Sequence, residues 1–449
     1  MPDGEFRTWW DDLDRDFEVE PVPFSQMRGW HFEPDTGDLV HESGRFYSIQ
    51  GARVWDGDRV VVSRPIINQP EIGTLGILVK EFDGVPHCLM QAKFEPGNVN
   101  IRQLSPTVQA TQSNLTRVHQ GGSTPYAEYF VGSRRGRVLV DVLQSEQGAW
   151  FWRKRNRNIV VEVTEDVPLR HDYCWLTLNQ LQRLLREDHL VNMDARTVLS
   201  CLPVMPGASA TRADDPFTRA LLRSYDAGGD GDTAEGALLS RVDIVSTLIE
   251  TKVWSETRSE LIPLGRVRGW SRDESEIHDD GGADFRVAGF RIRADIREVR
   301  SWDQPLLATR APGLAVLLAR PVEGVLHFLV QALSEPGLLD EVELAPTVRL
   351  HGRHGENARW PDVPFLEEAL TEDPARVRHD VVLSEEGGRF HHVQNRYRVV
   401  EVGEEFPVEA LPGYCWVTVR QLMEMLRHGH YLTIEARTLL ACVHSMSAD

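Results

Sequence analysis

Polar side chains alternate with apolar ones between residues 88 and 111. The odd-numbered positions are the polar residues Gln91, Lys93 and Glu95, and the even-numbered positions between them are Met90, Ala92 and Phe94. A strand with this pattern presents functional groups on one face and core residues on the other. A second row, of uncharged hydrogen-bonding groups, follows at Gln103, Ser105, Thr107, Gln109 and Thr111. Such a row is typical of a solvated sheet face or of a pocket for a hydroxyl-rich ligand.

A basic cluster runs through Trp152, Arg153, Lys154, Arg155, Asn156 and Arg157, although the formal net charge of the 449-residue chain is −19. Cations gathered in this way can clamp a diphosphate through charge-assisted hydrogen bonds. The alternative is an exposed basic strand end that balances local acids. His119 and Tyr129 are candidate proton carriers, although a lone histidine is more often structural.

Composition narrows the class of protein. An excess of 68 acidic over 49 basic residues argues against nucleic acid as a partner. No apolar run reaches the roughly 18–20 residues that span a bilayer, and the acidic N-terminus lacks the apolar region of a secretory signal. The five cysteines are an odd number and include no CxxC, which suits a reducing compartment. We therefore predict a cytoplasmic chain without a membrane partner. The cysteines at equivalent positions of the two repeats, the pairs 174/415 and 201/442, are predicted to be small core residues.

The elements that must position these groups occur twice. QAKFEPGNVNIRQLSPTVQA (91–110) aligns without gaps to QALSEPGLLDEVELAPTVRL (331–350) with nine identities in twenty. RGW at 28–30 and 268–270, and Ser-Glu at 145–146 and 384–385, extend the match. We predict a first repeat at 15–205, a flexible acidic linker that passes into a helix at 206–254, and a second, degenerate repeat at 255–446.

Within each repeat, strand patterns dominate the middle and a helix closes the unit. Strands are predicted at 76–82, 87–95, 137–143 and 158–163, and amphipathic spacing predicts helices at 176–187 and 238–253. This order indicates an α+β fold with a mixed sheet flanked by helices. Because Lys93 becomes Leu333 and Lys154 becomes Val393, we expect the chemistry in the first repeat. The second repeat is either a scaffold for a dimer or a nucleotide site without catalysis.

Motifs for other chemistries are missing: the chain has no GxGxxG, GxxxxGK[ST], GxSxG or HExxH. Instead, QAKFEPGNVNIRQLSPTVQATQSNLTRVH (91–119), SEQGAWFWRKRNRNIVVEV (145–163), CWLTLNQL (174–181) and VNMDARTVL (191–199) together resemble the nucleoside-diphosphate-hexose 2,3-dehydratases. The resemblance runs over nearly the whole chain. It implies two Nudix-like domains, and neither repeat has the Nudix metal box, so pyrophosphate hydrolysis is not implied.

The resemblance implies dehydration of a nucleotide-linked 4-keto-6-deoxyhexose, most simply dTDP-linked, in deoxysugar biosynthesis for natural products such as antibiotics. It also implies a homodimer and a reaction that needs neither a cofactor nor a metal. A base removes the C3 proton, hydrogen-bond donors stabilise the enolate, and an acid assists departure of the C2 hydroxyl. The alternative is a non-catalytic nucleotide-sugar binding or partner protein, which would not exchange the C3 hydrogen with solvent.

Candidate site residues follow from this reaction. Glu95 or His119 is the expected base, and His119 or Tyr129 the expected acid. Arg117, Arg153, Lys154 and Arg155 are expected on the diphosphate. The sugar or enolate would contact Asn98, Asn100, Gln103, Thr107, Gln109 and Asn114. Lys93, Trp152 and Asn156 complete the predicted binding set.

Overall fold

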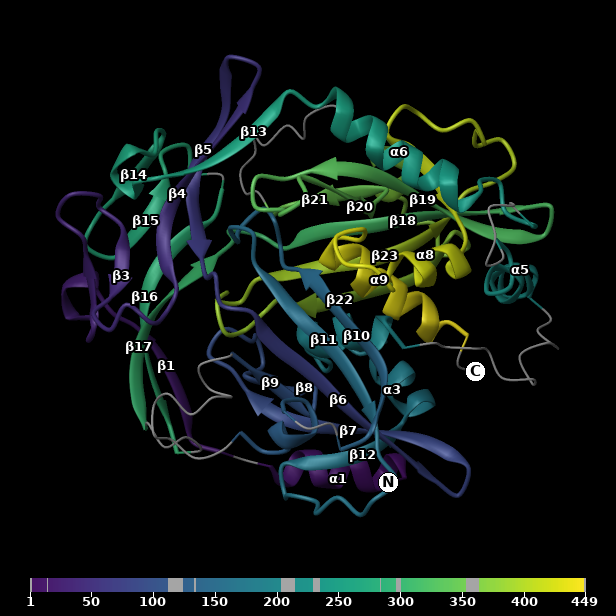
Figure 1. Ribbon diagram of the computed structural model, residues 1–449, viewed down its shortest axis with the longest axis horizontal. Coiled ribbons are helices and arrows are strands. Elements are labelled where there is room, and N and C mark those ends of the chain that lie inside the picture. The colour runs from purple at the N-terminus through teal and green to yellow at the C-terminus, as the bar shows by residue number, and fades with distance from the viewer. Residues whose placement is uncertain are drawn as a thin grey trace.

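The structure is a computed structural model that describes residues 2–13, 15–111, 124–132, 135–202, 215–228, 235–282, 284–295, 300–352 and 363–447. It is an α+β fold built mostly of sheets, and its two halves are similar (Figure 1). None of the helices in these ranges is long and apolar enough to cross a membrane.

The first half begins with a helix and ends with two. Its elements are α1 (Asp3–Asp12), β1 (Phe17–Pro21), η1 (Phe24–Gln26), β2 (Trp30–Phe32), β3 (Leu39–His41), β4 (Ser48–Asp56), β5 (Arg59–Asn68), β6 (Gly73–Phe82), β7 (Val85–Phe94), β8 (Arg102–Ser105), β9 (Val108–Ala110), η2 (Ala127–Tyr129), β10 (Arg137–Ser145), β11 (Arg155–Glu162), β12 (Tyr173–Thr177), α3 (Leu178–Leu184) and α4 (Met193–Ser200). The four strands and the helix predicted for this repeat are confirmed.

Two helices, α5 (Pro216–Ser224) and α6 (Arg241–Trp254), connect the halves. The helix predicted at 238–253 is confirmed as α6. The expectation of a flexible linker misses α5, which buries Phe217 and Leu221 and packs beside β19 of the second half. Asp215 caps α5 by accepting a hydrogen bond from the backbone N–H of Thr218 at 2.8 Å.

The second half repeats the order of the first. Its elements are β13 (Thr257–Ile262), η4 (Leu264–Arg266), β14 (Trp270–Arg272), β15 (Glu276–Asp279), β16 (Arg286–Ala294), β17 (Ser301–Ala308), β18 (Gly313–Val322), β19 (Val325–Ser334), β20 (Val342–Pro346), β21 (Val348–Leu350), α7 (Leu366–Ala369), β22 (Val377–Ser384), β23 (Gln394–Glu401), β24 (Tyr414–Val417), α8 (Val419–Met425) and α9 (Ile434–Ser445).

Each half has a large mixed sheet. In the first half, β10, β11, β6, β7 and β12 are neighbours, with β8 beside β7 and β9 beside β6, and the order in the second half is equivalent. Among the described residues, one pair of strands in each large sheet is parallel, β6 with β11 and β18 with β23, and the other strand pairs are antiparallel. This pair brings Gly73 opposite Asn156, so the start of β6 lies next to the basic cluster.

The two smaller sheets exchange their outer strands. β1 pairs with β16 of the second half, and β13 pairs with β4 of the first, both antiparallel. Figure 1 shows β1 beside β16 and β17, and β13 beside β4 and β5. Because each small sheet contains a strand from the other half, the halves form one joined structure rather than two independent domains connected by a linker.

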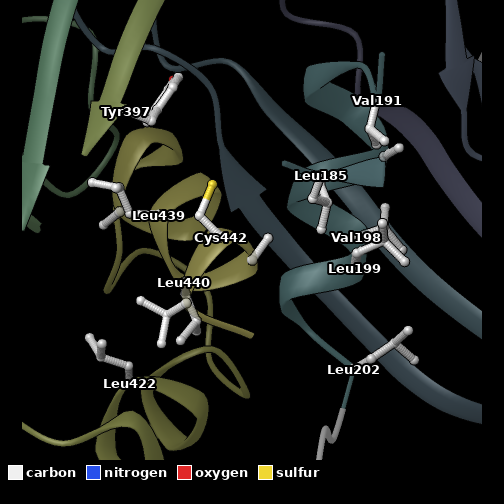
Figure 2. Packing of buried hydrophobic residues seen from close by; sticks show 14 of the residues in the cluster. Leu185, Val191, Val198, Leu199, Leu202, Tyr397, Leu422, Leu439, Leu440 and Cys442 are labelled. Carbon is white, nitrogen blue, oxygen red and sulfur yellow. The ribbon is translucent and has the colours of Figure 1, made fainter. Parts of the chain in front are cut away.

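Helices from both halves share one apolar core. Figure 2 shows two groups of side chains facing each other there: Leu185, Val191, Val198, Leu199 and Leu202 of the first half, and Tyr397, Leu422, Leu439, Leu440 and Cys442 of the second. Cys174, Cys415 and Cys442 are buried in this core as predicted. Fully burying one such aliphatic side chain stabilises a fold by about 1.5–3 kcal/mol.

Matching capping boxes begin the helices that follow the last strand of each half. Thr177 accepts from the backbone N–H of Gln180 at 3.1 Å, and the Gln180 side chain accepts from the Thr177 N–H at 3.0 Å. Thr418 and Gln421 make the same pair at the start of α8. These reciprocal bonds satisfy N–H groups that a helix leaves open, so both repeats start this helix at the same point.

Candidate active site

A pocket of about 150 Å³ lies where the large sheet of the first half meets the second half. The first half supplies Gln69, Gly73, Leu75, Lys93, Glu95, Pro96, Gln109, Ala110, Thr111, Glu146, Phe151, Lys154, Asn156 and Asp194. The second half supplies Trp302, Gln304, Glu386, Gly388 and Arg389. Neither repeat therefore forms this pocket alone.

Crossed backbone hydrogen bonds hold the second-half loop against the pocket. The Gly97 N–H donates to the Gly387 carbonyl at 2.8 Å, and the His392 N–H donates to the Gly97 carbonyl at 2.7 Å. A Cβ atom on Gly97 would lie 1.5 Å from the carbonyl oxygen of Phe390. Only glycine allows this approach, which explains the Glu-Pro-Gly segment in structural terms.

Two buried arginines fix the same loops from the helix side. Arg196 of α4 donates to the Ser384 carbonyl at 2.8 Å, and Arg437 of α9 donates to the carbonyl of Ser145. Each arginine therefore ties down the other half's Ser-Glu loop, which carries Glu146 in the first half and Glu386 in the second. Buried donors that are paired in this way position the carboxyl groups firmly.

Glu95 stands between a cation and an amide. Its Oε1 accepts from Gln109 Nε2 at 2.9 Å and lies 3.3 Å from Lys93 Nζ. The Gln109 Oε1 in turn accepts from Ser105 at 2.8 Å and from Asn192 at 3.1 Å. The second polar row thus orients the amide that holds Glu95, and it places a negative carboxylate beside the pocket.

Glu146 is buried in the wall of the same pocket. Its Oε1 accepts from Asn156 Nδ2 at 2.5 Å, and Asn156 is oriented by the Gly73 N–H at 3.0 Å. Burial, and then the charge of Glu386, raises the pKa of Glu146 to about 7. Burial likewise raises the pKa values of Asp194 and Glu386 above their ordinary values. The pocket therefore holds three acids with raised pKa values, of which Glu146 loses its proton only near neutral pH.

Three cations face these acids. Burial lowers the pKa of Lys154 to about 8, and its ammonium group donates to the Glu71 carbonyl. Arg389 donates to Gln69 at 3.0 Å and to the Gly388 carbonyl at 2.7 Å. Together with Lys93, these groups suit a substrate that carries negative charge or develops it on an oxygen.

The arrangement offers both forms needed for proton transfer. Glu95 is paired with the ammonium group of Lys93, whereas burial and the charge of Glu386 raise the pKa of Glu146. An ion-paired carboxylate and a buried carboxyl group can act as base and acid in one site. The chemistry that this pocket supports is removal of a proton from carbon with an acid available for a leaving oxygen.

Five of the predicted site residues line the pocket together: Lys93, Glu95, Gln109, Lys154 and Asn156. Gln103 and Asn98 are buried behind it; Gln103 donates to Asn100 and to Ser384, both at 2.9 Å, and Asn98 donates to the Ile101 carbonyl at 3.3 Å. They support the loop and do not face the pocket.

Several other predicted residues lie elsewhere. Thr107 is buried and bridges the backbones of β6 and β7; Thr347 makes the equivalent bonds in the second half. Asn100 donates to the His189 carbonyl at 2.9 Å. Arg153 is exposed over the ring of Trp152, and Arg155 lies on β11 opposite Ser145. None of these side chains lines the pocket.

Tyr129 lies in a separate apolar cluster with Leu78 and Leu89. Burial raises its pKa to about 12, and a hydrogen bond with Glu165 adds to the shift. Asn114, Arg117 and His119 lie outside the described residues.

The sequence reasoning missed Glu146, Asp194, Glu386, Arg389, Trp302 and Gln304. A signal for Glu386 was present, because the aligned Ser-Glu loops carry Gln147 in one repeat and Glu386 in the other. Differences between repeats had already pointed to Lys93 and Lys154.

Comparison with known proteins identifies the family of the chain. The family model for NDP-hexose 2,3-dehydratase matches residues 3–202 and 242–443. The chain is similar, at 47% identity over 100% of its length and 92% of the relative, to a dTDP-4-dehydro-6-deoxy-alpha-D-glucopyranose 2,3-dehydratase of Saccharopolyspora spinosa. Relatives of the same name from Amycolatopsis orientalis and Streptomyces violaceoruber are each 44% identical over 96% of the chain, which covers 88% and 94% of their lengths.

The class of protein that these matches define is a hydro-lyase acting on a nucleotide-linked sugar. The chain belongs to the NDP-hexose 2,3-dehydratase family.

Proposed function

We propose that the pocket between the halves is where this chain dehydrates a dTDP-linked 4-keto-6-deoxyglucose across C2 and C3. The observation that carries the proposal is the meeting of paired Glu95 with the protonated carboxyl of Glu146 in one pocket, in a member of a family named for this reaction.

The reaction balances without an external oxidant. The C4 ketone acidifies the C3 hydrogen, a base takes that proton, and the electrons of the C3–H bond form an enolate. The C2–O bond then breaks, the hydroxyl leaves as water with a proton from an acid, and a C2–C3 double bond remains. The resulting enol gains a proton at C2 and becomes a 3,4-diketo sugar.

Glu95 is the proposed base, because Gln109 and Lys93 hold its carboxylate at the pocket wall. Lys93 is also placed to stabilise the enolate oxygen, since a fixed cation acts where charge develops. The roles predicted for His119 and Tyr129 stay predictions.

The size of the pocket suggests which part of the substrate it holds. At about 150 Å³ it is smaller than the roughly 300–1,000 Å³ typical for drug-sized ligands. We propose that it holds the sugar ring, with the diphosphate near Arg389 and Lys154. Trp302, half-buried in the lining, would meet the nucleoside side.

The finer structural expectations belong to the same proposal. Each half is Nudix-like, with repeat boundaries near 15–205 and 255–446, and two copies of the chain form a homodimer in the cytoplasm. The mixed sheet with one parallel pair in each half supports the fold proposal.

The test is to incubate the protein with the dTDP-linked 4-keto sugar in deuterated water and follow the sugar by NMR and mass spectrometry. Trapping with an aromatic 1,2-diamine captures the vicinal diketone. Loss of one water with deuterium at C2 of the product is expected. An unchanged sugar that nevertheless binds would overturn the proposal and indicate a non-catalytic binding protein.

A further inference from the structure

We infer that Glu146 of the first half and Glu386 of the second half share one proton, and that this proton is delivered to the departing C2 hydroxyl. This inference rests on the proposed function and adds to it: the second half supplies a catalytic carboxyl group to the first half's pocket.

The geometry of the two carboxyl groups is alike. Both line the pocket, and each has one oxygen held and one unbonded. Asn156 holds Glu146 Oε1 at 2.5 Å, and the Gly388 N–H holds Glu386 Oε1 at 3.2 Å. The second oxygen, Oε2 of each, is buried without a hydrogen-bond partner among the described residues. A buried unbonded carboxyl oxygen costs free energy unless a proton or a ligand meets it.

The equivalent pair on the other side of the molecule has a glutamine in place of one of the two acids. There Glu385 takes the place of Glu146, and Gln147 takes the place of Glu386. The Gln147 amide donates to Glu385 at 2.7 Å, and Tyr397 and Asn395 donate at 2.6 and 2.9 Å. Three donors satisfy both oxygens of that carboxyl group, so neither oxygen is left unbonded as Oε2 of Glu146 and of Glu386 are.

In the first repeat the amide donor is replaced by a second acid. Both carboxyl groups line one pocket, and the charge of Glu386 opposes the ionisation of Glu146. Such a pair titrates together, and this pair holds one proton. The charged groups facing the pair are Glu95, Asp194, Lys93, Lys154, Arg389 and Arg437. Fully ionised, the four acids of the pocket outnumber its three cations, and an incoming diphosphate would favour protonation further.

The proposed step follows the removal of the C3 proton. The shared proton moves from the pair to the C2 oxygen as the C2–O bond breaks, and the pair is left with both carboxyl groups ionised. The electrons of the enolate form the C2–C3 double bond, and water leaves. A solvent proton then restores the pair for the next turnover.

The experiment uses Glu386→Gln and Glu146→Gln in the full-length protein, with Glu367→Gln as the matched control. Glu367 is an exposed glutamate of α7 in the second half. The amide of Glu386→Gln fits, because Gln147 occupies the equivalent place. Thermal unfolding checks that each variant folds.

Two rates are measured in deuterated water: loss of water, and deuterium entering C3 of the unreacted substrate. Base action at C3 continues in Glu386→Gln, whereas loss of water slows by about 100-fold or more, as expected for a missing general acid. The ratio of exchange to elimination therefore rises by a similar factor. A residue with only a structural role would lower both rates together.

The pH profile gives a second readout. Turnover by the native protein falls as pH rises through about 7, where the pair loses its proton. In Glu386→Gln the amide favours the ionised form of Glu146, so the remaining activity falls at lower pH.

The outcomes separate this inference from the proposed function. Failure of the native protein to dehydrate the sugar would sink the proposed function itself. Native turnover together with an unchanged exchange-to-elimination ratio in both variants would overturn the shared-proton inference alone. Loss of turnover in Glu367→Gln would assign the effect to stability and also count against it.

Discussion

Glu95 and Glu335 follow equivalent strands in the two halves, yet their surroundings differ. Arg349 donates to Glu335 and pairs with Glu435 at 2.9 Å between Nε and Oε1. His351 Nε2 lies 3.7 Å from the same Glu335. In the first half, Gln109 stands where Arg349 would be, and Glu95 faces an open pocket.

Neighbours from the opposite half differ as well. Trp150 of the first half packs against His351 with the two rings tilted and their centroids 4.9 Å apart, whereas its counterpart Arg389 lines the first-half pocket. The same backbone fold therefore carries a closed ion-pair cluster in the second half and a reactive pocket in the first. A few substitutions, such as Gln109 against Arg349 and Lys154 against Val393, separate the two states.

The largest effect is expected where the closed cluster is broken. Arg349→Gln removes the cation between two buried acids, and breaking a buried pair costs about 3–5 kcal/mol. We expect a marked fall in the denaturant midpoint. The control is Arg137→Gln, whose partner Glu162 forms a surface pair worth about 0–1 kcal/mol. Equal small losses in both variants would show that the cluster does not hold the second half together.

The contrast explains which parts of the molecule could be predicted from sequence. The strands around Lys93 and Glu95 follow from period-two alternation, which is local information. The exchange of β1 and β13 between halves is set by pairing between distant segments, and alternation does not specify a partner. For the same reason Arg389 could not be predicted as a site residue, because it reaches the pocket only through the contact between the two halves.

Site residues were predicted where a polar group stood out in its own strand. Thr107 fitted the polar row, but backbone groups of β6 and β7 take up its hydroxyl. Asp194 was hidden within the apolar pattern of α4, where buried acids are rare. Its role depends on the pocket above it, which no local pattern describes.

Opposite pH dependence should distinguish Glu146 in the pocket from Glu335 in the closed ion-pair cluster. The folded pKa of Glu146, about 7, lies above the value of about 4.3 in an unfolded chain. The folded protein then binds more protons between these values, so stability falls as pH rises through that window. Burial opposes the charge of Glu335, but Arg349 lowers its pKa to about 2; its stabilisation is present above about 4.3 and is lost as pH falls.

Denaturant unfolding of the native protein and of Glu146→Gln, at several pH values, measures this difference. A shift from the ordinary value to about 7 corresponds to roughly 3 kcal/mol, at 1.36 kcal/mol per unit. We expect the native protein to lose stability relative to Glu146→Gln between about pH 4.5 and 7. Glu335→Gln should change the profile only below about pH 4.5. Parallel curves for the native protein and Glu146→Gln would contradict a protonated Glu146.

The sharpest test of the comparison places an arginine, like Arg349 of the second half, at the equivalent position of the first half. Gln109→Arg places a guanidinium beside Glu95, as Arg349 is beside Glu335. The same guanidinium comes within reach of Asp194, which is equivalent to Glu435. An arginine there would neutralise the proposed base and occupy the space of the sugar, so turnover should fall by about 100-fold or more, the lower range for loss of a general base. Lys93, which is Leu333 in the second half, opposes the new charge and limits any gain in stability. Turnover is measured beside that of Arg349→Gln, whose change lies outside the pocket and should leave the rate per folded molecule unchanged. A Gln109→Arg protein that still dehydrates at the native rate would show that an open space at residue 109 is not what distinguishes the two halves.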